Sequence, residues 1–105
     1  RNKESDIGHI IENLAYLELL RRGYDVYVGD IDKGEVDFVA IKNNQTEYYQ
    51  ISATTLNPDT LARELAPLQS VQDNYPKYLL TLDELFGEAN YNGIQKKNLI
   101  KWLLE

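Results

Sequence analysis

Two carboxylates and an amide on neighbouring extended segments could together bind a cation. Glu35 and Asp37 stand two residues apart in the segment 35–41, and Gln50 belongs to the next such segment, 47–52. Because side chains alternate across a strand, Glu35 and Asp37 are expected to share one face. Carboxylates among apolar strand residues are costly to desolvate unless they bind a cation, pair with a base or accept hydrogen bonds. The pair therefore indicates either a binding site or a structural network.

A helix and a three-stranded meander are predicted to position these groups. Apolar residues recur at helical spacing between Asp6, which is a plausible cap, and Gly23, which favours a helix over this segment. Three segments of strand-like sequence follow with short connections: 24–28, 35–41 and 47–52. Short connections join antiparallel neighbours, so an antiparallel meander is expected.

The second half of the chain is predicted to add a helix, a buried strand and a closing helix. Asn57 is a possible cap for a second helix, in which Pro67 is expected to cause a kink or an early end. The segment 78–82 is nearly all apolar, as is typical of a strand covered on both faces. We interpret 87–93 as a loop. The tail, 94–105, is predicted to form a short helix, with room for a brief edge strand before it.

The composition indicates one globular domain without cysteine chemistry. The chain has 105 residues, 43% of them hydrophobic, which suffices for one core and is too short for two domains. Cysteine is absent, which excludes disulfides and thiolate metal sites, and the lone His9 excludes a multi-histidine zinc site. No run of about eighteen apolar residues and no signal peptide occur, so we expect a cytoplasmic domain without a membrane partner.

The charge balance limits how this chain could contact nucleic acid. Its net charge of −6, from 11 basic and 17 acidic residues, argues against a surface that binds phosphates through bulk electrostatics, although a local site remains compatible with it. The sequence also contains no phosphate-binding loop of the G-x-x-x-x-G-K type. No nucleotide site is therefore expected in this chain.

Several short motifs occur in an order that resembles a known superfamily. They are Gly8-His9-Ile10-Ile11-Glu12-Asn13, Leu19 with Arg21-Arg22-Gly23-Tyr24, Glu35-Val36-Asp37-Phe38-Val39, Tyr49-Gln50-Ile51, and Asn74-Tyr75-Pro76-Lys77-Tyr78 with Leu82-Asp83. Together they resemble the restriction-endonuclease-like PD-(D/E)xK nuclease superfamily, and more narrowly the uncharacterised C-terminal domain of many bacterial and archaeal AAA-type ATPases. The resemblance covers nearly the whole chain.

The resemblance implies a fold, a protein context and partners. The expected fold is α/β, with a helix, three strands, a helix and a strand as its core and a mixed central sheet flanked by helices. Residues 1–105 would form one nuclease-like domain, excised from the C-terminus of a larger ATPase. The implied partners are the ATPase domain of the same full-length protein and DNA.

The resemblance also assigns roles to particular residues. In the superfamily a helix glutamate, a strand aspartate and an acid-x-lysine on the next strand hold a divalent metal ion and activate water against a phosphodiester. Glu12 matches the helix acid and Asp37 the strand aspartate, and Mg²⁺, which prefers carboxylate oxygens, is the implied cofactor. The acid-x-lysine motif is not matched, because Tyr48 stands in place of the acid and Gln50 in place of the lysine. Glu35 could replace the missing ligand.

Structural alternatives exist for these acids, and two classes of function stay open. Asp37 could simply cap backbone amides at the end of a sheet. Glu18 is a rival to Glu12, although Arg21 and Arg22 follow it at pairing distance on a helix and favour a structural role. The domain is accordingly either a Mg²⁺-dependent deoxyribonuclease with a degenerate site or a catalytically inactive interaction or regulatory module.

Overall fold

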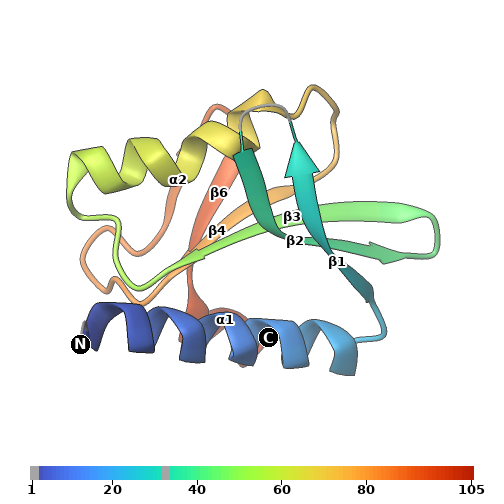
Figure 1. Cartoon of the computed structure of the whole chain (residues 1–105), viewed down its shortest axis with the longest axis horizontal. Coiled ribbons are helices and arrows are strands. Elements are labelled where there is room, and N and C mark those ends of the chain that lie inside the picture. The colour runs from blue at the N-terminus through green and yellow to red at the C-terminus, as the bar shows by residue number, and fades with distance from the viewer. Residues whose placement is uncertain (1–2, 32–33) are drawn as a thin grey trace.

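The computed structural model describes residues 3–31 and 34–105, and within them a six-stranded mixed sheet lies between helices (Figure 1). In chain order the elements are α1 (Lys3–Arg21), β1 (Asp25–Ile31), β2 (Gly34–Lys42), β3 (Gln45–Ser52), α2 (Pro58–Ser70), β4 (Lys77–Thr81), β5 (Ala89–Tyr91), β6 (Ile94–Asn98) and α3 (Leu99–Leu103). The sheet order is β1-β2-β3-β4-β6-β5. The predicted α/β class with a mixed central sheet flanked by helices is confirmed.

The pairing of the strands follows from the lengths of their connections. β1, β2 and β3 form the predicted antiparallel meander. β4 follows a helical crossover and therefore lies parallel to β3, and it also lies parallel to β6. β5 pairs only with β6, antiparallel, and forms one edge of the sheet among the described strands.

Two hydrophobic clusters attach the helices to opposite faces of the sheet. In Figure 1, α1 lies along one face and α2 along the other. The α1 side is filled by Ile11, Ala15, Leu19, Ala40, Tyr49, Ile51, Leu80, Leu99 and Trp102, and the α2 side by Val36, Leu65, Leu68, Leu79 and Ile94. Adjacent residues of β4 thus enter different clusters, because neighbouring side chains of a strand point to opposite faces. The prediction that 78–82 is covered on both faces is confirmed.

The two long helices differ from the prediction at their ends. The first begins at Lys3 rather than at Asp6, so Asp6 lies inside the helix instead of capping it. Asn57 does cap α2, because its side-chain oxygen accepts hydrogen bonds from the backbone N–H groups of residues 59 and 60. Pro67 does not end this helix, which continues to Ser70.

The segment before α3 was predicted incorrectly. The expected loop at 87–93 contains β5, and the tail contains β6, which lies inside the sheet rather than at its edge. The missed signal is Asn92-Gly93, whose positive φ angles of 52° and 97° suit a tight hairpin turn between these strands. The predicted turn before β2 includes Asp32 and Lys33, which lie outside the described residues.

A membrane-spanning helix would need both length and apolar composition. None of the helices in the described part of the chain combines the two.

Candidate functional site

The polar site begins where the pairing of β2 with β3 ends. Phe38 and Tyr49 form the last pair of this ladder. Beyond it, the Asp37 N–H donates to Gln50 Oε1 at 2.7 Å, and the Ile51 N–H donates to Asp37 Oδ2 at 2.8 Å. These side-chain hydrogen bonds replace those that a continued ladder would make. Asp37 and Gln50 are therefore held rigidly between the two strands.

Two further acids approach this point from the helices on either face of the sheet. Glu12 of α1 lies close enough to Asp37 for its charge to raise the Asp37 pKa, and its Oε2 lies 3.7 Å from His9 Nδ1. From α2, Glu64 accepts hydrogen bonds from Gln50 Nε2, at 3.1 Å to its backbone oxygen and 3.3 Å to its carboxylate. Four elements thus bring three carboxyl groups and one amide together, including the predicted Glu12, Asp37 and Gln50.

Sequence reasoning missed Glu64, although a signal was present. Glu64 stands three residues after Leu61 and four before Leu68, so it lies on the side of α2 that packs against the sheet. An acid on the packed side of a helix needs a polar neighbour in the protein interior. That neighbour is Gln50, which comes from the facing strand and could not be deduced from the helix alone.

Burial and like charge together change the acidity of this cluster. Burial raises the pKa of Asp37, the hydrogen bond from the Ile51 N–H lowers it, and the nearby charges of Glu12 and Glu64 raise it again, to about 7. Burial likewise raises the pKa of Glu64. Asp37 is therefore protonated much more readily near neutral pH than an ordinary aspartate, and Glu12 is one of the acids whose charge raises its pKa.

The other predicted acids do not join the cluster. Glu35 is exposed on β2 opposite Asp30, and its charge is not among those that shift the Asp37 pKa. Glu18 accepts hydrogen bonds from Arg21 at 2.7 Å and from Arg22 at 2.6 Å, and these bonds lower its pKa to about 2. The structural interpretation of Glu18 is supported, whereas the exposure of Glu35 and its place opposite Asp30 do not favour the predicted ligand role.

The donor chemistry of the cluster fits a hard divalent cation. Carboxylate oxygens are the ligands that Mg²⁺ prefers, and Glu12 and Asp37 provide them side by side. Among residues 3–31 and 34–105, however, no group of three His, Cys, Asp or Glu side chains lies close enough to hold a metal ion. Tyr48, at the place of the missing acid, donates its hydroxyl to Asp73 at 2.6 Å. The site therefore offers two adjacent carboxyl ligands rather than three.

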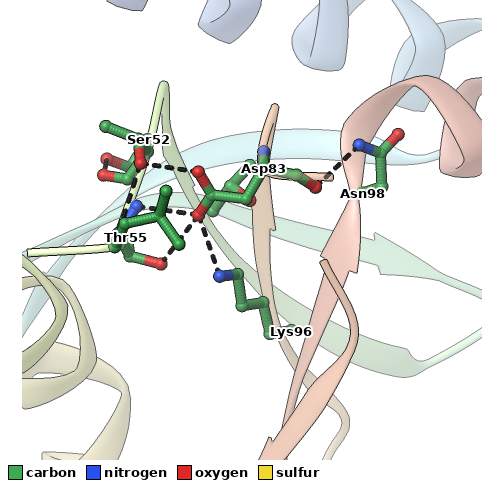
Figure 2. A network of polar contacts seen from close by, with 8 residues as sticks. Ser52, Thr55, Asp83, Lys96 and Asn98 are labelled. Carbon is green, nitrogen blue, oxygen red and sulfur yellow. Dashed lines mark hydrogen bonds and ion pairs between the residues drawn. The ribbon is translucent and has the colours of Figure 1, made fainter. Parts of the chain in front are cut away.

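A second polar network lies at the carboxyl ends of the parallel strands β3, β4 and β6 (Figure 2). Lys96 Nζ donates to Asp83 Oδ2 at 2.8 Å, and these two side chains are only 2% and 3% exposed. Thr54 Oγ1 and the Thr55 N–H also donate to the Asp83 carboxylate, and the Asn98 amide donates to its backbone oxygen. Burial raises the Asp83 pKa, but the bonds from Lys96, Thr54 and Thr55 lower it to about 2.

This second network is closed on itself. Within the described residues, every buried side-chain nitrogen and oxygen has a hydrogen-bond partner. Asp83 therefore connects the loop after β3 with β4 and β6, and its role is to stabilise the fold. Sequence reasoning did not find the pair, because Asp83 lies in the loop after β4 and Lys96 lies in β6, and only the fold brings them together.

Comparison with known proteins finds a similar protein, but the name of that protein states no activity. No family model matches the chain. An uncharacterized protein from Haemophilus influenzae is 35% identical to it over 103 residues, which are 98% of this chain and 25% of that protein. The chain thus spans about a quarter of the length of the curated relative it matches.

Proposed function

We propose that this chain is a nuclease-like accessory domain of a prokaryotic AAA-type ATPase, and that Glu12 and Asp37 bind a divalent cation for work on DNA. The observation that carries the proposal is the meeting of Glu12, Asp37, Gln50 and Glu64 from four different elements. The order of helix, antiparallel meander, helix and parallel strand also agrees with the restriction-endonuclease-like fold that the sequence resembles. The greater length of the Haemophilus relative is compatible with a domain of a larger protein.

The electrostatics of the cluster favour a cation. Burial raises the pKa of Asp37 and Glu64 most, and the like charges of the three half-buried carboxyl groups add to the shift, so the ionised cluster is costly. A divalent cation offsets this repulsion and displaces the proton from Asp37. When bound, such an ion supplies neutralisation of charge on a phosphate and a lowered pKa of water.

The residues of the chain have separate tasks in this proposal. Glu12 and Asp37 hold the cation. Gln50 positions Asp37 through the hydrogen bond that its Oε1 accepts from the Asp37 N–H, and Glu64 in turn positions the Gln50 amide. Gln50 cannot act as a base at neutral pH, so the chain by itself is expected to cleave DNA slowly even when the ion is bound.

The proposal is tested by calorimetric titration of the 105-residue chain with Mg²⁺ and Mn²⁺, combined with a cleavage assay on flapped and branched DNA. Saturable binding at millimolar metal is expected, with loss in Asp37→Asn and weakening in Glu12→Gln. Glu35→Gln is the matched control, because it removes an exposed acid from the same strand, and its binding should equal that of the wild type. Equal metal binding by all three variants, or none by the wild type, would overturn the proposal.

A second candidate, an inactive docking or regulatory module, is favoured by one observation. Asp37 and Gln50 both make backbone hydrogen bonds that replace the strand ladder, so a purely structural reason for their presence exists. In that case Asp37→Asn keeps the fold. Neither the wild type nor the variant binds Mg²⁺ or Mn²⁺ in the titration. The same titration therefore separates the two candidates.

A further inference from the structure

An arginine without an assigned role borders the carboxyl cluster. Arg63 directly precedes Glu64 in α2, and its side chain is exposed. Burial raises the pKa of Glu64 most, and the charge of Arg63 lowers it, so the guanidinium group lies within electrostatic reach of the cluster. The cluster of acids therefore has a positive charge next to it on the α2 side.

The position of Arg63 on α2 turns its side chain to solvent beside Glu64. Successive residues of a helix turn by about 100°, which places Glu64 between the buried leucines of α2 and Arg63. Glu64 thus contacts Gln50, whereas the length of the arginine side chain allows it to reach the solvent side of the cluster. A ligand can approach the cluster from solvent, since the Glu12 side chain is 35% exposed.

Arg63 is not engaged by another side chain of the described residues. Most basic side chains in the described part of the chain form an ion pair or a hydrogen bond: Arg21, Arg22, Lys42, Lys77, Lys96 and Lys97. The side chains of Arg63 and Lys101 form neither with any described residue. The N–H groups of Arg63 are therefore available to a ligand, in a planar arrangement that matches two oxygens of a phosphate.

A DNA strand needs such a group at this place. The chain carries a net charge of −6 and three of its acids meet in the cluster, so an approaching phosphate is repelled unless local positive charge compensates. The cation held by Glu12 and Asp37 supplies part of that charge, and the Gln50 amide supplies none. We propose that Arg63 binds the phosphate group of the DNA strand that faces this cation. This assignment, which rests on the proposed function, makes Arg63 a substrate-binding residue rather than a ligand of the ion.

DNA binding by two charge-matched variants tests the proposal. Arg63→Gln and Lys101→Gln each remove one exposed positive charge that has no partner among the described residues, so they change the net charge equally. Fluorescence anisotropy with flapped DNA at millimolar Mg²⁺ gives the affinity over a range of salt concentrations. Arg63→Gln should weaken binding about 10-fold and lower the slope of log affinity against log salt by about 1, because one phosphate contact is lost. Lys101→Gln should bind as the wild type does.

Further variants separate a phosphate contact from a structural role. Arg63→Lys should keep the salt slope of the wild type but recover only part of the affinity, since an ammonium group lacks two parallel donors. Urea unfolding of Arg63→Gln should match that of the wild type, because the exposed side chain has no partner among the described residues. If the ion and Arg63 contact the same phosphate, the affinity losses of Arg63→Gln and Asp37→Asn should not multiply in the double variant.

The results for Arg63 and for the cation site are distinguishable. In calorimetry Arg63→Gln should bind Mg²⁺ as the wild type does, because Glu12 and Asp37 are unchanged. Equal DNA affinities of Arg63→Gln and Lys101→Gln, losses that multiply in the double variant, or no DNA binding by the wild type would overturn the role of Arg63 and leave the cation site standing. Absence of Mg²⁺ binding by the wild type would overturn both.

Discussion

Removing the charge of Asp37 should stabilise the protein above neutral pH and have little effect in acid. In the variant Asp37→Asn the amide oxygen can still accept the hydrogen bond from the Ile51 N–H, so the contact between the strands is retained. The charge that repels Glu12 and Glu64 is lost. The perturbation therefore isolates the electrostatic cost of the cluster from its hydrogen bonding.

The sign and size of the effect follow from the raised pKa. Because the folded protein holds the Asp37 proton up to about pH 7, whereas the unfolded chain releases it near 3.8, wild-type stability falls as pH rises through this window and levels off above it. A displacement of that size corresponds to at most about 4 kcal/mol. We expect about 2 kcal/mol, because local relaxation and residual structure in the unfolded chain reduce the difference.

Urea denaturation of wild type and Asp37→Asn between pH 4 and pH 8.5 measures this difference. The two proteins should have similar unfolding free energies at pH 4 and diverge as the pH rises, with the variant more stable at pH 8.5. Glu35→Gln, an exposed change on the same strand, should show no such divergence. If Asp37→Asn is less stable throughout, or if its difference from the wild type does not change with pH, then the burial of the Asp37 charge among like charges does not destabilise the fold.

Three further predictions concern the framework of the fold. Lys96→Met leaves the Asp83 charge buried without its partner and should cost about 3–5 kcal/mol of unfolding free energy in urea; a cost below about 1 kcal/mol would show that the pair is not needed. Because the Asp83 pKa is lowered to about 2, the stability that it contributes is present above pH 4 and is lost as pH falls through 2, and Lys96→Met should weaken this acid transition. Asn57→Ala removes the α2 cap and should lower stability by about 1 kcal/mol, whereas an unchanged urea midpoint would show that the cap contributes nothing.

The parts of the fold that could be predicted from the sequence depend on local signals. Apolar periodicity located α1, and the cap at Asn57 located the start of α2. The strands of the meander followed from alternation and short connections. β6 could not be found in this way, because two of its inward residues, Lys96 and Asn98, are polar. Their burial depends on Asp83 in the loop after β4, which no local pattern reveals.

The candidate site was predictable only in part, for a similar reason. Glu12, Asp37 and Gln50 were identified through the resemblance, and the structure places them together. The expectation that Glu35 shares this place rested on strict alternation along β2, which does not determine how far a side chain reaches. Glu64 belongs to a helix on the opposite face of the sheet from Glu12, and its approach to Gln50 is a long-range contact.

The pH dependence of divalent-cation affinity tests the central claim most directly, because Mg²⁺ or Mn²⁺ must displace the proton that Asp37 holds. Calorimetric titrations between pH 5.5 and pH 8.5 should show affinity that rises through pH 7 and then levels off, accompanied by proton release on the acid side. The variant Asp37→Asn should show neither. Metal affinity that is independent of pH, or that Asp37→Asn retains, would contradict a cation site built on Glu12 and Asp37.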